Sequence, residues 1–305
     1  MSTRKEKEVV SSSRVLYGIV PILVTPFDEA GAIDEASLRN EVDYAIHAGA
    51  HGLGIALGSE IFKLTEAERE RVSAIVIEQA RDRVPVIVNT GAAATDLAVF
   101  YSTRAQELGA SGVMCTPPGS GYSSSEVISY FKAISDAISV PIVIQDTNST
   151  PVPAPLILAI AKACENASYV KVESTPPASQ IYKAVQKVGE KVQVFGGAGG
   201  GQFLQELRRG SIGTMPFPST TEAFVRVWDL WQAGEKRAAE RVFADRIQPL
   251  LSIGTGTLGG GHIVHKRALQ KQGVIATSVV RPPADELDPI TLEELDEAFA
   301  TLGWN

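Results

Sequence analysis

Two charged residues interrupt an apolar run in the stretch YVKVES, residues 169–174. The run has the length and composition of a short strand, in which successive side chains point to opposite faces. Val170 and Val172 therefore share one face, and Lys171 and Glu173 share the other. Because lysine and glutamate are rarely buried unless they are paired, this pair is the first candidate for chemistry in the chain.

A lysine shielded from water can act as a nucleophile. Burial disfavours the ammonium form, so we expect the pKa of Lys171 to fall and its free amine to be available near neutral pH. Such an amine attacks a ketone and forms a Schiff base, whose protonated imine withdraws electrons from the neighbouring carbon. The alternative is a structural ion pair between Lys171 and Glu173. Since buried pairs are often no more stable than apolar replacements, two inward charges favour catalysis.

The elements around this strand follow a regular alternation of short β-rich runs and longer helical runs. Most of the short runs are continuously apolar, which is typical of parallel strands covered on both faces. Eight such runs are predicted strands: Tyr17–Val24, Gly52–Leu57, Val84–Asn89, Ser111–Thr116, Pro141–Gln145, Tyr169–Glu173, Val192–Gly196 and Ser211–Pro216.

Helix signals separate these strands. Thr65 followed by Glu68 forms a capping-box pattern at the start of one helical run, and Gly49 and Gly109 stand where helices should end. Eight strand–helix units in just over 200 residues predict a (β/α)8 TIM barrel. A doubly wound sheet is the alternative, but no GxGxxG motif follows the first strand to support it.

The chain divides into three parts on this interpretation. Residues 1–14 are polar and charged and are predicted to form a disordered tail. Residues 15–234 form the barrel. Residues 235–305 contain three helical runs with no strands between them, and we interpret them as a C-terminal helical extension.

The barrel prediction defines a candidate site, because active sites of this fold lie at the carboxyl ends of the strands. Lys171 and Glu173 belong to that end on the sixth strand. Other residues, mostly polar groups and glycines, are predicted to join them there: Thr25, Gly58, Ser59, Glu60, Asn89, Thr90, Thr116, Gln145, Asp146, Gly196, Gly197 and Pro216. Gly196 and Gly197 begin a glycine-rich loop, which we interpret as room for substrate to approach rather than as a phosphate site.

Composition narrows the classes of function. The net charge is −7 with no basic stripe, which argues against nucleic-acid binding. No apolar run approaches the roughly 18 residues of a transmembrane helix, so we expect no membrane association. Two cysteines are too few for a disulfide framework and fit a reducing, cytoplasmic location. The histidine pairs His47–His51 and His262–His265 lack further ligands, and we predict no metal and no cofactor.

Several motifs, in order, resemble the dihydrodipicolinate synthase/N-acetylneuraminate lyase family of Schiff-base-forming (β/α)8 enzymes. The resemblance runs from about Val15 to the C-terminus. It includes GIVPILVTPFDEAG, GSEIFKLTEAERERV, VPVIVNTGAAATD, SVPIVIQD and GSIGTM. YVKVES falls where the family carries its imine-forming lysine, so the resemblance assigns that role to Lys171.

The sequence also departs from the family pattern. The GTTGE motif is replaced by ALGSE, so Leu57 and Gly58 stand in place of two threonines. Gln145 stands where the family has a catalytic tyrosine, and Thr150 stands where dihydrodipicolinate synthases have a substrate-binding arginine. With the tyrosine–threonine proton relay gone, Glu173 becomes the candidate acid and base.

One branch, the 2-keto-3-deoxy-L-arabonate dehydratases, resembles the chain in its strand-five QD, its strand-six K-[IV]-E and its Ser-Glu pair. The resemblance implies a hydro-lyase acting on a 2-keto-3-deoxy sugar acid, with Gln145 and Ser59 orienting the substrate or a water. Two alternatives stay open: an aldolase that releases or condenses pyruvate, and a degenerate barrel that binds a keto acid without turning it over. The family resemblance also implies a homotetramer.

Overall fold

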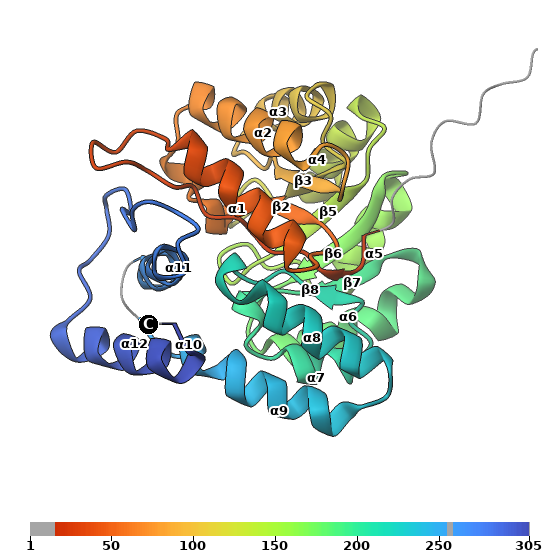
Figure 1. Ribbon diagram of the computed structural model, residues 1–305. Coiled ribbons are helices and arrows are strands. Elements are labelled where there is room, and N and C mark those ends of the chain that lie inside the picture. The colour runs from red at the N-terminus through yellow and green to blue at the C-terminus, as the bar shows by residue number, and fades with distance from the viewer. Residues whose placement is uncertain (1–15, 255–258, 305) are drawn as a thin grey trace, which may run out of the picture.

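Eight parallel strands form the centre of the molecule in the computed structural model, which describes residues 16–254 and 259–304 (Figure 1). The predicted disordered tail, residues 1–14, lies outside the described residues. The strands are β1 Gly18–Ile19, β2 Leu53–Ile55, β3 Val86–Asn89, β4 Gly112–Cys115, β5 Ile142–Asp146, β6 Ala167–Val172, β7 Gln193–Gly196 and β8 Gly213–Thr214. Each lies within or close to a predicted run.

The sheet closes on itself into a barrel. Its strand order is β1-β8-β7-β6-β5-β4-β3-β2. A parallel bridge between Ile22 and Gly54 joins the two ends, with hydrogen bonds from the Leu23 N–H to the Gly54 carbonyl and from the Gly54 N–H to the Pro21 carbonyl, both 2.9 Å. The predicted (β/α)8 barrel is confirmed.

Strand alternation divides the apolar core into two layers. The inner cluster takes residues from around the whole barrel, among them Ile87, Met114, Val143, Tyr169 and Phe195. The outer cluster lies between strands and helices and contains Val170 and Val172. Since Tyr169 faces inward and Val170 outward, Lys171 continues the inward face of β6, as the YVKVES alternation predicts.

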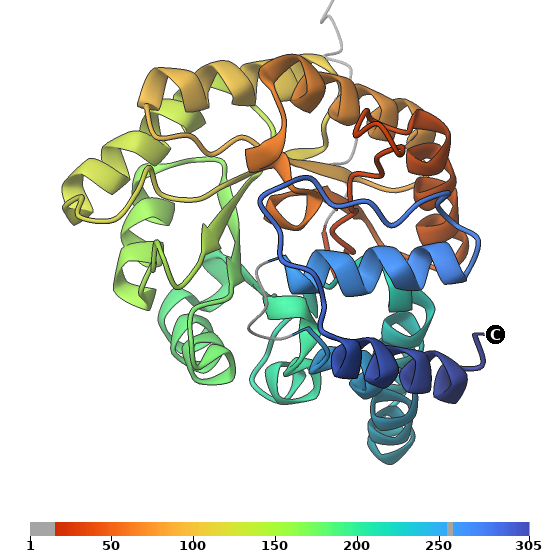
Figure 2. The same cartoon turned by 90° about the vertical axis from the view of Figure 1, so that its left-hand side faces the viewer.

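Helices surround the barrel, as Figure 2 shows from one end. Thr65 caps the second helix through reciprocal bonds with Glu68, and Gly49 and Gly109 have φ of 88° and 96° just past the first and third helices; these predicted ends are confirmed. The helices are α1 Glu35–His47, α2 Glu66–Ala80, α3 Thr95–Glu107, α4 Ser124–Ala137, α5 Ala154–Ala163, α6 Pro177–Val188, α7 Phe203–Leu207 and α8 Thr221–Gln232.

The C-terminal segment holds four helices in its described part, where the sequence pattern predicts three. They are α9 Lys236–Arg246, α10 Gln248–Leu251, α11 Gly260–Lys271 and α12 Pro289–Leu302. The first predicted helix is divided at Ile247, because Pro249 lies in the first turn of α10, where a proline is tolerated, and would break a continuous helix.

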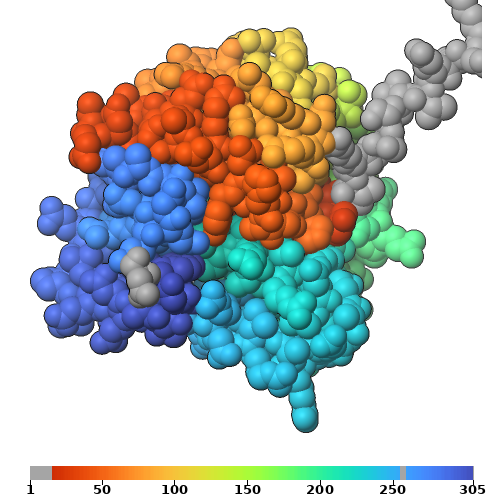
Figure 3. Space-filling view, in the orientation of Figure 1, coloured from red at the N-terminus to blue at the C-terminus, as the bar shows by residue number. Residues whose placement is uncertain are grey.

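The C-terminal helices pack onto the barrel beside the N-terminal segment, as the blue and red surfaces of Figure 3 show. The Tyr44 hydroxyl on α1 bonds Gln272, just after α11, at 3.0 Å. Within the described part of the chain, no helix is long and apolar enough to cross a bilayer.

Candidate active site

A cavity of about 110 Å³ opens at the carboxyl ends of the strands, around Lys171. One side is polar, formed by Lys171, Glu173 and Gln145, and the other is largely apolar. Lys171 and Glu173 are the only ionisable groups among the described residues that line it. The remaining lining residues are Ile22, Leu57, Gly58, Gly199, Met215, Pro216 and Phe217.

The Lys171 amine and the Glu173 carboxylate form an ion pair inside this cavity. Lys171 Nζ lies 3.0 Å from Glu173 Oε1, and the lysine side chain is only 5% exposed. Glu173 follows directly after β6, so the two charges come from one strand end. The predicted inward orientation of both residues is confirmed.

Two side-chain amides extend the polar group from Glu173 through hydrogen bonds between residues of three strand ends. Gln145, on β5, donates from Nε2 to Glu173 Oε2 at 2.8 Å. Asn89, on β3, donates from Nδ2 to Gln145 Oε1 at 3.1 Å. Because Asn89 occupies the oxygen of the Gln145 amide, the Gln145 NH₂ group is directed at the carboxylate.

Glu173 is ionised in this arrangement. Burial pushes the pKa of its carboxyl up. The Lys171 ammonium, the Gln145 amide and the Ala198 backbone N–H, which bonds Oε1 at 3.0 Å, outweigh burial and hold the pKa below its usual value. A carboxylate beside an amine can accept a proton from that amine or from a bound substrate.

Two glycines let the backbone pack against these groups. A Cβ on Gly197 would lie 2.5 Å from Glu173 Cγ and 2.8 Å from Lys171 Cε. A Cβ on Gly196 would lie 1.9 Å from an oxygen of Glu206, on the opposite side of the strand. Gly197 therefore borders the Lys171–Glu173 pair, while Gly196 faces the outer layer.

The turn after β2 forms another wall of the cavity. Gly58 lines it and packs against the Phe217 ring. A Cβ added to Gly58 would lie 3.2 Å from Phe217 Cε1. The Ser59 hydroxyl is used within the structure: it donates to the Leu23 carbonyl after β1 and accepts from the Ala56 N–H at 3.1 Å. Glu60 does not line the cavity, and its carboxylate pairs with Lys63 and Lys266.

Asp146 and Thr116 lie outside the group that surrounds Lys171. Asp146 organises a loop, since its carboxylate accepts from the Val152 N–H at 2.8 Å and from the Ser174 N–H at 3.0 Å. It borders a separate hollow near the start of α5. Thr116 packs close to the backbone of Gly91 and is absent from the lining of the Lys171 cavity.

Two polar residues near the site have no role assigned to them by the sequence. Asn89 is among the predicted strand-end residues, and the structure adds its bond to Gln145. Glu206 is fully buried on α7, and neither of its carboxylate oxygens makes a hydrogen bond of normal geometry within the described residues, although the Thr214 hydroxyl lies near them. Its signal is a single acid in the short apolar helix FLQEL.

Glu206 has an unusual protonation state. Burial raises the pKa of its carboxyl to about 8, and the negative charge of Glu173 adds to the rise, while the nearby Thr214 hydroxyl opposes it. At neutral pH this carboxyl is therefore protonated, and so uncharged, in most of the molecules.

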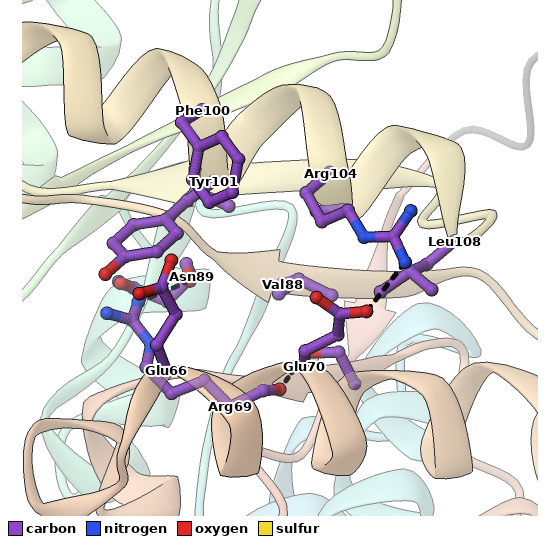
Figure 4. Close-up of a pocket in the computed structure, with 12 residues that line it drawn as sticks. Glu66, Arg69, Glu70, Val88, Asn89, Phe100, Tyr101, Arg104 and Leu108 are labelled. Atoms are coloured by element: carbon purple, nitrogen blue, oxygen red, sulfur yellow. Dashed lines mark hydrogen bonds and ion pairs between the residues drawn. The ribbon is translucent and has the colours of Figure 1, made fainter.

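A second hollow lies outside the barrel between α2 and α3 (Figure 4). The Arg69 guanidinium lies 4.4 Å from the centre of the Tyr101 ring and donates to the Asn89 carbonyl at 3.3 Å. Arg104 pairs with Glu70 at 2.6 Å. This hollow is separate from the Lys171 cavity; Asn89 lines only the outer hollow, while its side chain donates to Gln145.

Neither histidine pair of the sequence belongs to a metal-binding group. The described residues contain no cluster of three histidine, cysteine, aspartate or glutamate side chains that could hold a metal ion. His51 Nδ1 accepts from the Ile19 N–H at 3.1 Å, and His265 Nδ1 lies 2.7 Å from the Ser219 hydroxyl. Cys115 and Cys164 are buried and free.

The chain matches a known protein family and is similar in sequence to known proteins. Residues 15–302 match the model of the dihydrodipicolinate synthetase family. The chain is 31% identical to the L-2-keto-3-deoxyarabonate dehydratase of Azospirillum brasilense over 91% of the chain and 92% of the relative. It is 26% identical to a 4-hydroxy-tetrahydrodipicolinate synthase of Methanopyrus kandleri over 94% of the chain and 97% of the relative.

Solved structures share the fold. A dihydrodipicolinate synthase from Rhodopseudomonas palustris superposes with a TM-score of 0.85 at 27% identity, over 96% of this chain and 99% of its own. YagE, a prophage protein of the dihydrodipicolinic acid synthase family from E. coli K12 in complex with pyruvate, gives 0.86 at 22% identity, over 95% and 100% of the two chains. At that identity the likeness concerns the fold alone.

Proposed function

The chain belongs to the dihydrodipicolinate synthetase family, and from this premise we propose that it is a Schiff-base lyase that dehydrates a 2-keto-3-deoxy sugar acid of the 2-keto-3-deoxy-L-arabonate type. The observation that carries the proposal is the contact of Lys171 with Glu173, which is itself bonded by Gln145. A carboxylate that touches the imine-forming amine can take over the proton transfers that a tyrosine performs in the family pattern.

The first stage is formation of the imine. Glu173 accepts a proton from the Lys171 ammonium, and the free amine adds to the C2 ketone of the substrate. Glu173 returns its proton to the C2 oxygen, which leaves as water and gives a protonated imine, and the imine acidifies the C3 protons. The 3.0 Å contact supports this role, since a proton can move directly between the two groups.

The second stage is elimination. Glu173 takes a C3 proton to give an enamine and passes that proton to the C4 hydroxyl, which leaves as water. Hydrolysis of the resulting imine returns Lys171 and releases a dehydrated keto acid or its tautomer. Gln145 keeps the Glu173 carboxylate oriented throughout, and Asn89 keeps Gln145 oriented.

Substrate binding uses the other walls of the cavity. We propose that the backbone at Gly58 receives the substrate carboxylate and that Gly197 leaves room for the carbon chain beside Lys171. The apolar side formed by Ile22, Met215 and Phe217 excludes water from the imine.

The decisive experiment is a screen of 2-keto-3-deoxy pentonates and hexonates with identification of the products. The proposal expects loss of one water from one of these acids, and borohydride added during turnover should attach the substrate carbon skeleton to Lys171. Turnover without any borohydride adduct would contradict the Schiff-base mechanism.

The alternative is an aldolase that releases or condenses pyruvate, and the synthases among the relatives favour it. It uses the same Lys171 imine but breaks or forms a carbon–carbon bond. Pyruvate among the products of the screen would decide for the aldolase. Binding of a sugar acid without turnover would instead indicate a degenerate barrel.

The proposal extends to a cytoplasmic homotetramer. The buried, unpaired state of Cys115 and Cys164 is compatible with a reducing compartment. Large apolar side chains on α3, Leu97 at 38% and Phe100 at 52% exposed, supply a surface that assembly would cover.

A further inference from the structure

A buried ion network links the C-terminal helix α11 to the turn beside the cavity. Lys266 Nζ lies 2.5 Å from Glu60 Oε1, and both side chains are fully buried. Lys63 pairs with the second oxygen of Glu60 at 3.2 Å. Lys266 also donates to the Val279 carbonyl at 2.8 Å and lies 4.4 Å from the centre of the Phe27 ring.

Glu60 ends the turn that follows β2, residues 57–60, whose first two residues line the cavity. Its φ of 55° is a left-handed conformation, which costs energy for a residue with a side chain. The preceding residues Leu57 and Gly58 line the cavity, and Ser59 is fixed by Thr25, whose hydroxyl donates to the Ser59 carbonyl at 2.6 Å. The ion pair therefore holds the outer end of the segment that faces Lys171.

The residue before Lys266 holds the neighbouring wall. His265 stacks on Phe217 with ring centres 4.3 Å apart and planes 21° apart. Its Nδ1 is 2.7 Å from the Ser219 hydroxyl, which fixes the ring. Phe217 packs against Gly58. His265 therefore supports Phe217, and the next residue, Lys266, holds the turn that contains Gly58 through Glu60. Figures 1 and 2 show α11 against the barrel, separate from the ring of strand-connecting helices.

Stability alone is a weak reason for this network. Removing one partner of a buried pair is costly, but apolar residues of similar volume often replace the whole pair without loss. The network instead joins residues 206 positions apart in the sequence, beside a turn whose residues Leu57 and Gly58 line the cavity.

We propose that α11, through Lys266 and His265, positions the Gly58–Phe217 wall to receive the carboxylate end of a 2-keto acid. Glu60, Lys266 and His265 are thus positioning residues, and none of them touches the Lys171 amine. The inference rests on the proposed function only for the identity of the group that the wall receives.

The test measures how much pyruvate is needed to form a borohydride-trapped adduct at Lys171. The paired variant Lys266→Met with Glu60→Gln removes both buried charges together. It should reach the same maximal adduct as wild type but need at least tenfold more pyruvate, because the wall moves while Lys171 and Glu173 stay. His265→Gln, which removes the stacking and no buried charge, should shift the requirement in the same direction.

Arg267→Met is the matched control, since Arg267 is exposed on the same helix and should leave the pyruvate requirement unchanged. Thermal unfolding of each variant establishes that it is folded. A wild-type pyruvate requirement in a folded paired variant overturns the inference and leaves the proposed function standing. If the paired variant does not fold, an unchanged requirement in His265→Gln overturns it. An absent adduct in the wild-type protein overturns both.

Discussion

Glu173 receives more polar contacts than any other group in the cavity. The Lys171 amine and the Ala198 N–H approach one oxygen at 3.0 Å, and the Gln145 amide approaches the other at 2.8 Å. These donors favour the ionised carboxylate. In the proposed mechanism, imine formation consumes the Lys171 amine and releases water, so the same carboxylate then faces the acidified C3 protons of the substrate.

Replacement of Glu173 by glutamine tests this role at the residue scale. The amide keeps the shape and can still bond its neighbours, but it cannot accept a proton. We expect turnover to fall by about 10²–10⁴-fold, the range typical of a positioned general base, while a borohydride adduct with pyruvate still forms at Lys171. Mass spectrometry of the trapped protein measures the second quantity. Turnover near the wild-type rate would make Glu173 a bystander.

Gly197 is a second residue on which the reactive geometry depends. Gly197→Ala would place a methyl group 2.5 Å from Glu173 Cγ and 2.8 Å from Lys171 Cε, closer than real Cβ contacts allow. The pair must move, and we expect turnover to fall at least 10²-fold, since small misplacements of reacting groups have effects of about this size.

Gly201→Ala serves as the control in the same loop. Gly201 has a φ of −60° and its nearest neighbour, the Ala198 carbonyl oxygen, is 3.9 Å from the ideal Cβ position. Activity assays of the two variants should separate them clearly. Equal activities would mean that the approach of Gly197 to the pair has no catalytic importance.

Strand alternation was sufficient to orient Lys171, because a side-chain period of two is a local property of the backbone. The environment of Glu60 was beyond any local rule. Its partner Lys266 lies on a helix 206 residues later in the chain, and only the folded chain brings them together. Asp146 illustrates the same limit, since its carboxylate serves the loop that begins α5 instead of the cavity.

At the scale of elements, α7 places an unpartnered acid against the seventh strand. Burial raises the pKa of Glu206 from 4.5 to about 8. The folded state therefore binds a proton more tightly than the unfolded state does. The contribution of Glu206 to the free energy of unfolding becomes unfavourable as the pH rises from 4.5, and the loss is complete near pH 8.

Glu206→Gln should remove this pH dependence, because the amide mimics the neutral acid. At pH 5 the free energies of unfolding of the two proteins should be similar. Toward pH 8 the variant should become the more stable, by on the order of 1 kcal/mol for each pH unit. Urea unfolding at pH 5, 6, 7 and 8 measures the difference.

The difference between the variant and the wild type reports the contribution of Glu206 alone, without that of other buried acids. Glu41 also has a pKa raised to about 8, chiefly by burial, and it contributes equally in both proteins. Stability curves that stay parallel from pH 5 to pH 8 would contradict the assignment of a buried neutral carboxyl to Glu206.

Element boundaries followed local signals where these were strong. Thr65 and Glu68 defined the start of α2, and glycines marked the ends of α1 and α3. The C-terminal segment was predicted less well. Its first helical run was divided at Ile247, since Pro249 fits the first turn of a new helix and not the interior of an old one.

At the scale of the molecule, the barrel count determined both the fold and the end at which the site lies. Parallel closure brings β3, β5 and β6 to one rim, so Asn89, Gln145 and Lys171 meet although they are far apart in the sequence. The pattern could not show that α11 would support two walls of that rim. Helical periodicity predicts that a helix forms, but the surface on which it packs depends on tertiary contacts.

Assembly of several chains is the remaining prediction at this scale. Leu97 and Phe100 lie one turn apart on the exposed side of α3, and Figure 4 shows Phe100 beside Tyr101 on this helix. An interface between copies would remove their apolar surface from water. Light scattering of the wild-type protein should give a mass about four times the 32.4 kDa of one chain.

Phe100→Glu should reduce that mass, because an interface centre rarely tolerates an unpaired charge. Tyr182→Glu on α6 is the control, since Tyr182 is 54% exposed and Phe100 is 52% exposed, and its mass should stay that of the wild type. Dissociation by Tyr182→Glu alone would move the interface to α6. A wild-type mass of 32.4 kDa would exclude the tetramer, and the apolar surface of α3 would then remain exposed to solvent.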